Sequence, residues 1–292
     1  MKLVYSGLIL ALFFTSCKEQ PIQIDMGGNS WDTAYVSTVE TPQPKMYLVE
    51  ELTGVRCSNC PEGAEFLDGL NEQNGNKFII VGLHTGSLTN PIPGKSIQDF
   101  RTKDGDQMRG LVFGGEGNKP SVAFDRLPLS TGQNEYFVEA TNNWGQAIVQ
   151  MKQYATTTPI NIALNSAYNA SEDKYDIEVR LNFTEDVNGP IALNIFAIEN
   201  GIHDGFVESD TPILYNHVFR RSITTAVGET ILNDHPEKKE GLTYVYKTSF
   251  SINANDDKEK FWKPEQMKIV AFVSNSTPTD KHVFQVAQVD MK

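Results

Sequence analysis

The Cys-x-x-Cys sequence formed by Cys57 and Cys60 constrains the fold of this chain more than any other feature. It stands between two short apolar runs, 46–49 and 77–84, which have the length and composition of buried strands. The intervening stretch 64–71 is predicted to be helical, with three apolar side chains on one face: Phe66, Leu67 and Leu70. A strand, a cysteine pair, a helix and a second strand in this order indicate a βαβ unit, the context in which the motif is typical of redox chemistry.

The position of the pair at the start of a helix has a chemical consequence. A thiol there faces unpaired backbone N–H groups and the positive end of the helix dipole, so its thiolate is favoured. The three-residue spacing lets the sulfur of Cys60 reach that of Cys57. We therefore expect these two cysteines to pair, which leaves Cys17 as the third cysteine of the chain.

Length and charge limit the remaining possibilities. At 292 residues, with 39% hydrophobic residues, the chain is long enough for two domains with real cores. Its formal net charge of −12 argues against nucleic acid and against anionic lipid headgroups as partners.

The N-terminus has the pattern of a secretory signal peptide, predicted over residues 1–16. A basic start precedes an apolar run that is too short to span a membrane as a helix. The small residue Ser16 directly before Cys17 resembles a bacterial lipobox, which implies a lipoprotein whose membrane partner is reached through the lipidated Cys17. We expect residues 17–45 to form a lipidated tether, with a short strand at 33–39, in the envelope of a diderm bacterium, where disulfides persist.

Residues 46–154 are predicted to form a thioredoxin-like α/β domain. Helices are expected near 96–111 and over 136–154, the latter with an apolar stripe made by Phe137, Trp144, Ile148 and Met151. Pro120 enters an apolar strand downstream of the cysteine pair and matches the cis-proline position of thioredoxins.

Residues 155–292 change to period-two alternation, which predicts an all-β domain. Candidate strands are 161–164, 175–183, 191–198, 244–252, 268–274 and 282–289, separated by turn-rich spacers. This number of short strands suggests an immunoglobulin-like β-sandwich domain. The predicted fold class is therefore α/β plus all-β.

A closer resemblance rests on the sequence Leu-Val-Glu-Glu-Leu-Thr-Gly-Val-Arg-Cys-Ser-Asn-Cys-Pro-Glu-Gly at 48–63. It is similar to the signature of the twenty-eight-kilodalton outer-membrane-protein family of Bacteroidetes, and segments 99–102 and 216–220 also resemble family sequences. The resemblance implies an outer membrane lipoprotein with a thioredoxin-like domain followed by a β-rich domain. It implies location and fold. It does not imply a single activity, because the family is described both as adhesin-like and as redox-like.

Resemblance to thioredoxin-like oxidoreductases assigns roles to individual residues. Cys57 would be the exposed attacking thiol and Cys60 the buried resolving one. Glu51 matches the buried acid that assists deprotonation of the second cysteine. Strand alternation places Glu50 on the other face, so we expect one carboxylate inward and one outward.

The residues around the cysteines depart from the thioredoxin pattern. Arg56 stands where thioredoxins carry tryptophan, and Ser58-Asn59 replaces Gly-Pro, so the direction of the redox chemistry is open. Arg56 and Lys119, which precedes Pro120, are cations that would favour the thiolate further. We expect the side chains of Arg56, Ser58, Asn59 and Lys119 to lie near a protein substrate.

Two functional classes remain open from sequence. One is a thiol–disulfide oxidoreductase that acts on a protein substrate or an envelope partner, from the periplasmic or the cell-surface face. The other is a non-catalytic surface module, adhesin-like, in which the cysteines form a structural disulfide. Cys57, Cys60 and His84 imitate a soft copper site, but the histidine spacing matches no metal motif, and we expect no metal and no cofactor. Asn216 and His217 are interpreted as a hydrogen-bonding pair at a strand edge.

Overall fold

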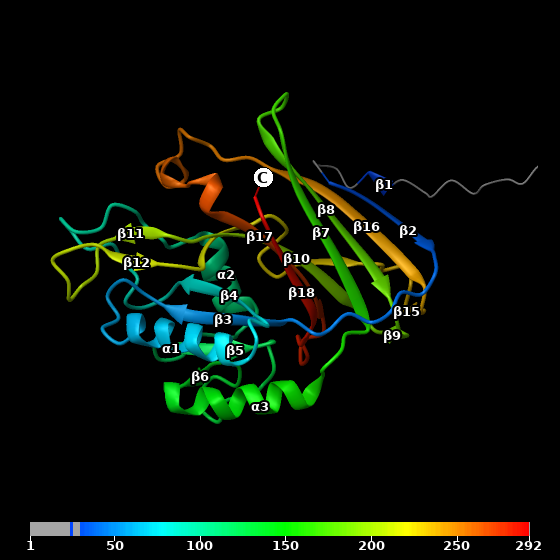
Figure 1. Cartoon of the computed structure of the whole chain (residues 1–292), viewed down its shortest axis with the longest axis horizontal. Helices are drawn as coiled ribbons and strands as arrows, with labels where there is room; N and C mark the ends of the chain where they lie inside the picture. Colours follow the sequence, from blue (N-terminus) through cyan, green and yellow to red (C-terminus); the bar gives the residue numbers. More distant parts are fainter. Residues whose placement is uncertain (1–23, 26–29, 292) are drawn as a thin grey trace, which may run out of the picture.

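The computed structural model describes residues 24–25 and 30–291. Within them the chain is a mixed α/β structure made mostly of strands in several sheets, with few helices (Figure 1). The predicted signal peptide over 1–16 and the predicted lipidation site Cys17 lie outside the described residues. No helix of the described part is long and apolar enough to cross a membrane.

The helices are short and lie mainly against one end of the structure. They are α1 (Cys60–Gln73), α2 (Lys103–Leu111) and α3 (Trp144–Tyr154), with single 3₁₀ turns at Thr141–Asn143, Glu259–Phe261 and Pro264–Gln266. In Figure 1 α1 lies just below β3, the strand that leads to the cysteines, and α3 lies lower, at the bottom of the molecule. The expected helix after the first strand is confirmed as α1.

The larger sheet has nine strands, and its main path runs β18-β17-β10-β13-β4-β3-β5-β6, with β14 paired to β10. Their bounds are β3 (Tyr47–Thr53), β4 (Phe78–His84), β5 (Ser121–Phe124), β6 (Val138–Glu139), β10 (Ile191–Glu199), β13 (Val218–Ser222), β14 (Glu229–Ile231), β17 (Met267–Asn275) and β18 (Val283–Asp290). Only the pairs β3–β4 and β4–β13 are parallel. The two predicted apolar strands on either side of the cysteines are confirmed as β3 and β4.

The junction between β4 and β13 joins the two halves of the chain. Val218 pairs with Gly82, and the N–H of Gly82 donates to the carbonyl of His217 at 2.7 Å. A β-carbon on Gly82 would lie 3.3 Å from that carbonyl oxygen, so glycine allows the close approach. The sequence-based boundary at residue 155 falls between α3 and β7, yet the halves on either side of it share one sheet.

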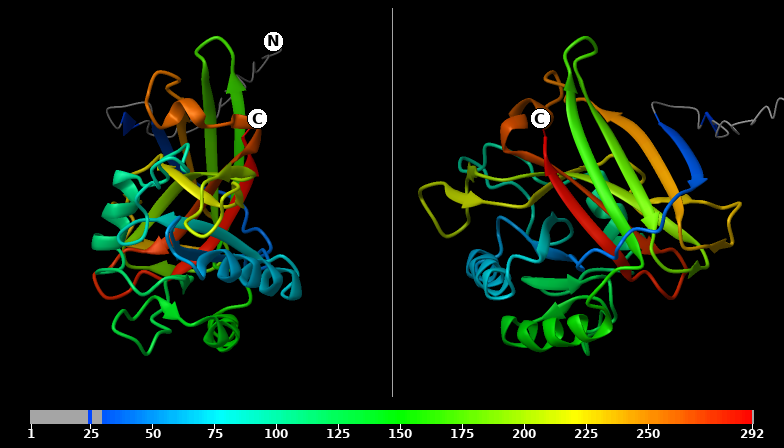
Figure 2. Two further views of the ribbon diagram at one scale, coloured as in Figure 1. Left: turned by 90° about the vertical axis from the view of Figure 1, so that its left-hand side faces the viewer. Right: turned by 45° about the vertical axis from the view of Figure 1, so that its right-hand side comes forward.

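The second sheet has five strands in the order β1-β2-β16-β8-β7 and is antiparallel. Its strands are β1 (Ile24–Asp25), β2 (Trp31–Val36), β7 (Ile160–Asn169), β8 (Lys174–Phe183) and β16 (Leu242–Phe250). The β7–β8 hairpin projects away from the α3 end in both views of Figure 2. The short strand predicted at 33–39 within the tether is found at 31–36 as β2, which pairs antiparallel with β16.

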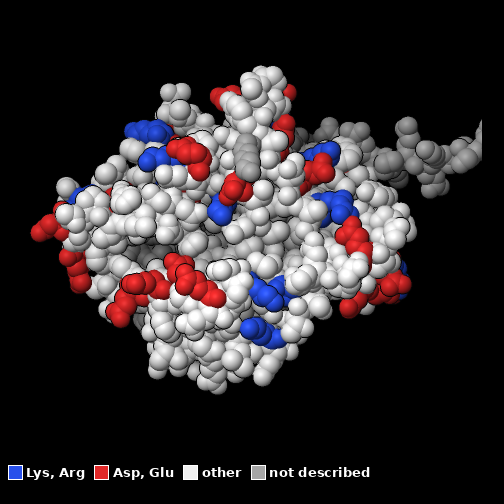
Figure 3. All heavy atoms as spheres, in the orientation of Figure 1, with Lys and Arg blue, Asp and Glu red and all other residues white. Residues whose placement is uncertain are grey.

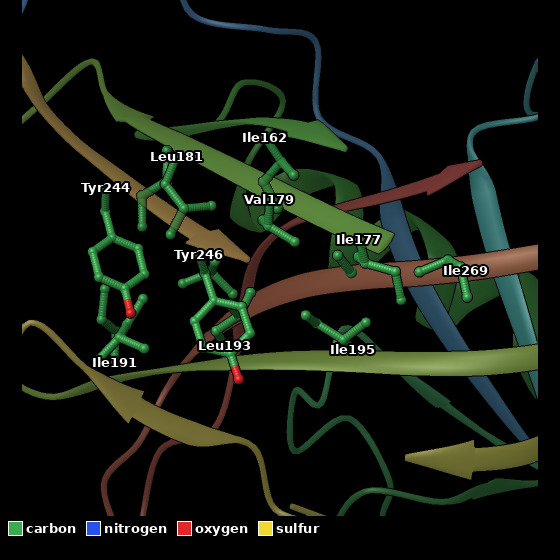
Figure 4. Close-up of a cluster of buried hydrophobic side chains, with 14 of the residues drawn as sticks. Ile162, Ile177, Val179, Leu181, Ile191, Leu193, Ile195, Tyr244, Tyr246 and Ile269 are labelled. Atoms are coloured by element: carbon green, nitrogen blue, oxygen red, sulfur yellow. The ribbon is translucent and has the colours of Figure 1, made fainter. Parts of the chain in front are cut away.

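The core between the sheets is built from the inward-facing side chains of both. Ile177, Val179 and Leu181 of β8 face Leu193 and Ile195 of β10, as Figure 4 shows. Each is at most 2% exposed. Burying such a side chain stabilises the fold by about 1.5–3 kcal/mol. The period-two pattern of the C-terminal strands therefore has its cause in this interface.

The strand β4 is buried along its whole length because both faces of the larger sheet are covered. On one face α1 and α3 pack through Leu67, Leu70, Trp144 and Ile148. On the other face lie α2 and side chains from strands of the C-terminal half, among them Phe196 of β10 and Phe272 of β17. Strands that are covered on both faces read as continuous apolar runs.

All six predicted C-terminal strands are confirmed, as β7, β8, β10, β16, β17 and β18. The shorter pairs β11 (Ile202–Asp204) with β12 (Ile213–Tyr215) and β9 (Val187–Asn188) with β15 (Glu237–Lys238) were not anticipated. Nor was β13, whose five residues include Arg220 and Arg221 and so lack an apolar run.

The helix expected over 96–111 begins only at Lys103. The buried carboxylate of Asp204 accepts hydrogen bonds from the N–H groups of Ile97 and Gln98, both at 2.8 Å, so this backbone is satisfied without a helix. The Thr102 side chain then accepts from Gly105 N–H at 2.9 Å and caps the helix.

The helix expected over 136–154 begins only at Trp144. The side chain of Asn134 accepts the N–H groups of Tyr136 and Phe137, and Val138 pairs with Val122 in β5. These contacts use the backbone groups that a helix would need. The predicted apolar stripe is nevertheless buried, with Phe137 supplied from outside the helix.

Candidate disulfide site and adjoining cavity

The cysteines lie where β3 turns into α1. Cys57 and Cys60 form a disulfide with their Cα atoms 5.4 Å apart, and Cys60 is the first residue of the helix. The N–H of Cys60 donates to the carbonyl of Cys57 at 3.0 Å. The predicted pairing is confirmed, and its position at a helix N-terminus is one that favours a thiolate.

Both cysteines are buried, so the expectation of an exposed Cys57 is wrong for this disulfide form. Their exposed fractions are 2% and 3%. Segments on either side cover the turn that carries them: the Arg56 N–H donates to the carbonyl of Leu88, and Val207 N–H donates to that of Val55. No local sequence pattern predicts this cover, because it comes from segments 31 to 150 residues further along the chain.

The four side chains expected near a substrate behave differently from one another. Ser58 and Asn59 are exposed at the tip of the turn. The Arg56 guanidinium donates to the carbonyls of Asn90 and Pro91, both at 2.8 Å, and so holds the neighbouring loop. The Lys119 ammonium lies 3.4 Å from Glu116.

Pro120 lies directly against the cysteine helix. The Lys119–Pro120 peptide bond is cis, as expected from the resemblance. A β-carbon on Gly63 would fall 2.8 Å from the Cγ of Pro120. The first turn of α1 and the loop before β5 are therefore in contact.

A groove of about 940 Å³ runs beside this contact. Its lining includes Asn59, Glu62, Phe66 and Pro120. Of the three apolar side chains predicted on one face of this helix, Leu67 and Leu70 are buried, and Phe66 is 44% exposed beside the Trp144 ring at the rim of the groove. Acidic side chains gather over α1 on this face of the molecule (Figure 3).

Glu51 lies buried next to the disulfide. Its side chain is 5% exposed, and Oε1 has no hydrogen-bond partner among the described residues. Burial raises the pKa of Glu51 to about 8, and the negative charge of Asp68 adds to the shift. Near neutral pH the carboxyl is therefore largely protonated.

Glu50 does point to the opposite face of β3, but the expectation that it faces outward is wrong. It is fully buried and bound by the Arg126 guanidinium in two hydrogen bonds of 2.8 and 2.9 Å. The reason is that strands of the C-terminal half cover that face as well.

A cavity of about 320 Å³ adjoins the disulfide on the other side of α1. Glu51, Cys60 and Asp68 line it from the N-terminal half, and Tyr215 and His217 line it from the C-terminal half. Sequence reasoning did not include the last two in the site. The available signal was the family-like segment 216–220, whose Asn216 and His217 are confirmed as a hydrogen-bonding pair with Gly201 and Asn200.

His84 lines the same cavity at the end of β4. It is 4% exposed, and neither ring nitrogen has a hydrogen-bond partner in the described chain. Burial lowers the pKa of His84 to about 3, assisted by the charge of Arg220. The ring packs against Phe100 and Tyr215, with centroid distances of 4.9 and 6.0 Å. No cluster of three or more potential metal ligands occurs among the described residues.

Fold and site together define a strand-rich α/β protein with a disulfide at a helix N-terminus beside a cis-proline. The chain belongs to a family of outer membrane proteins: the model described as "Outer membrane protein Omp28" matches residues 118–292. That match covers Pro120 and the C-terminal strands and lies downstream of the two cysteines. Family membership supports a location in the outer membrane.

Two solved structures share the fold at low sequence identity. HBP35 of Porphyromonas gingivalis is 15% identical with a TM-score of 0.64, and the alignment covers 85% of this chain and 76% of that one. A structural-genomics protein from Agrobacterium tumefaciens is 12% identical with a TM-score of 0.52, covering 86% and 96%. No curated protein sequence matches the chain.

Proposed function

We propose that this protein is a thiol–disulfide oxidoreductase of the bacterial outer membrane, with a thioredoxin-like site formed by Cys57, Cys60, Glu51 and Pro120. The observation that carries the proposal is the disulfide at the N-terminus of α1, with Pro120 against Gly63 of that helix. The buried, largely protonated Glu51 beside Cys60 supplies a site for the proton that the chemistry must move.

The reaction converts a substrate disulfide into two thiols. The Cys57 thiolate attacks one substrate sulfur, which breaks the substrate S–S bond, forms a mixed disulfide and releases one substrate thiolate. Near neutral pH only a minor fraction of Glu51 is ionised, since its pKa is about 8; this carboxylate takes the proton of Cys60, and the Cys60 thiolate attacks the Cys57 sulfur. The Cys57–Cys60 bond forms, the second substrate thiolate leaves, and two electrons have passed from the protein to the substrate.

The test is insulin-disulfide reduction by the full chain, compared with a variant carrying Cys57→Ser and Cys60→Ala. Wild-type activity above the variant supports the proposal, and equal rates overturn it. Glu72→Gln is the matched control, because it alters an exposed position of the same helix and keeps both sulfurs. The reduction potential of the Cys57–Cys60 pair indicates whether the protein reduces or oxidises its substrate, since catalytic pairs span about −270 to −120 mV.

The finer architecture belongs to the same proposal. The order β3-α1-β4, followed by β5 and α3, supports a thioredoxin-like unit. The five-stranded sheet packed on β10, β17 and β18 supports an immunoglobulin-like sandwich.

The membrane anchor is proposed to be lipid on Cys17. Labelling of the protein with radioactive palmitate, and its loss in Cys17→Ala, tests this. Protease treatment of intact cells distinguishes the cell-surface face from the periplasmic face.

A second function is favoured by the burial of both cysteines. In this alternative the disulfide is structural, and the protein is a surface module that binds a protein partner. A structural disulfide is expected to have a reduction potential below about −300 mV. That result, together with inactivity toward insulin, would favour the binding module.

A further inference from the structure

The cavity beside Cys60 holds two buried polar side chains that the described structure leaves without partners. The side chains are those of Glu51 and His84, and the atoms without a partner are Oε1 of Glu51 and both ring nitrogens of His84. Unpartnered polar atoms are costly to bury and in native proteins usually have a functional reason. The cavity is therefore a built polar site and not a packing defect.

An ion pair of two other residues lines the same cavity. Nε2 of His217 lies 3.3 Å from Oδ1 of Asp68, with the two side chains 30% and 47% exposed. They are thus in contact with solvent as well as with the cavity. Asp68 also acts electrostatically on Glu51.

The position of His217 is fixed by its backbone. Its N–H donates to Oδ1 of Asn200 at 2.8 Å, and its carbonyl accepts from Gly82 at 2.7 Å. Gly82 is the register partner of Glu51 in the parallel pair β3–β4. His217 has a φ of 58°, a left-handed conformation that non-glycine residues rarely adopt. The C-terminal half therefore holds His217 against β4, the strand next to the one that carries Glu51.

We propose that Asp68 and His217 are positioning residues that set the protonation of Glu51 and connect it to solvent, so that the C-terminal half completes the disulfide site. The inference rests on the proposed function and deepens it. When Cys60 passes its proton to the Glu51 carboxylate, an O–H bond forms inside the cavity. That proton must leave before the next cycle, and the Asp68–His217 pair lines the same cavity and is itself partly exposed to solvent.

The charge on the pair determines how readily Glu51 holds its proton. The Asp68 carboxylate opposes ionisation of Glu51, and the His217 ring, 3.3 Å from that carboxylate, is the group placed to offset its effect. Other titratable groups at the cavity are Glu65 on α1 and His84 on β4, and Arg220 acts on His84. The β11–β12 hairpin contributes only uncharged side chains to the lining besides His217: Phe206, Ile213, Leu214, Tyr215 and Asn216.

The first readout needs no redox activity. The Glu51 carboxyl is titrated by ¹³C NMR in the oxidised full chain, for wild type, Asp68→Asn and His217→Asn. Asparagine is chosen at 217 because it tolerates a positive φ. We expect Asp68→Asn to lower the titration midpoint of Glu51 by about one pH unit. His217→Asn is expected to raise it, because the Asp68 carboxylate then loses the contact with the imidazole ring.

The second readout is the pH profile of insulin reduction. Both variants should shift the part of the pH–rate profile that depends on Glu51. Both should also lower kcat with KM unchanged, because neither residue touches the substrate. Glu72→Gln on the exposed face of α1 and His203→Gln on β11 are the matched controls, since neither lines the cavity.

The two readouts separate the inference from the function beneath it. If the midpoint of Glu51 is the same in wild type and both variants, the inference is wrong, whatever the activity. If wild type is inactive toward disulfides while the midpoint shifts as expected, the proposed function is wrong and the electrostatic coupling stands.

Discussion

Gly63 and Pro120 are in such close contact that a β-carbon on Gly63 would lie 2.8 Å from the Cγ of the proline. This contact joins the first turn of the cysteine helix to the loop before β5. It fixes the distance between the disulfide and the groove that runs past Pro120.

Replacing Gly63 with alanine should therefore destabilise the protein. Alanine gains up to about 1 kcal/mol in helix propensity, but forcing a methyl group into this contact costs about 1–3 kcal/mol. We expect a net loss of about 1–2 kcal/mol in urea unfolding. Gly69→Ala is the control, because nothing lies within 4 Å of its β-carbon in the same helix. Equal stability of the two variants would contradict the packing described.

Removing one partner of the ion pair between Glu50 and Arg126 should strongly lower the free energy of unfolding. Both side chains are at most 2% exposed. Arg126→Met leaves a buried carboxylate without its cation, which costs about 3–5 kcal/mol. The double variant with Glu50→Gln should recover part of that loss in urea unfolding, whereas breaking the half-exposed Lys247–Glu178 pair should change stability little.

Glu51 should make the protein less stable as the pH rises. Its pKa is about 8 in the folded chain against 4.5 when unfolded, so between these values the folded state binds the extra proton. Stability is then fully present below pH 4.5 and is lost toward pH 8, with a slope of up to about 1.4 kcal/mol per pH unit. Comparing wild type with Glu51→Gln between pH 6.5 and 8 isolates this slope. A wild type as flat as the variant would contradict the burial of the acid.

His84 should act in the opposite sense at lower pH. Its pKa is about 3 in the folded chain against 6.5 when unfolded, so the unfolded state binds the extra proton and stability falls as the pH drops below 6.5. Between pH 4.5 and 6.5 this slope opposes that of Glu51. In His84→Gln the decrease in the free energy of unfolding caused by Glu51 should therefore begin near pH 4.5. Urea unfolding at a series of pH values measures this.

The cover over the cysteines should depend on Asp204. Its carboxylate binds the N–H groups of Ile97 and Gln98 and so ties the segment before α2 to β11, and Val207 shortly after β11 bonds to Val55. Asp204→Ala should speed reduction of the Cys57–Cys60 disulfide by dithiothreitol about tenfold, the effect of losing about 1.4 kcal/mol of closure. Asp210→Ala, which removes only an exposed ion pair with Lys95, should leave the rate unchanged.

Much of the fold follows from local patterns. The runs that became β3 and β4 are continuous and apolar because both of their faces are covered. Strand β8 alternates because one face is buried, whereas β10 is buried at every position. The helix limits were harder, since Asp204 and Asn134 supply hydrogen bonds that replace helix at 97–98 and 136–137. The strand β13 was missed because its two arginines obscure any apolar period.

The sequence by itself determined the cysteine pair, its place at the start of a helix, the cis-proline position and the family, because each depends on residues close together in the chain. The tertiary structure alone decided that Cys57 is covered, that Glu50 is buried with Arg126, and that His217 reaches Asp68. These depend on contacts between segments far apart in the chain: Val207 with Val55, Arg126 with Glu50, and β13 with β4. Backbone hydrogen bonding between such distant segments leaves no periodic trace in either one.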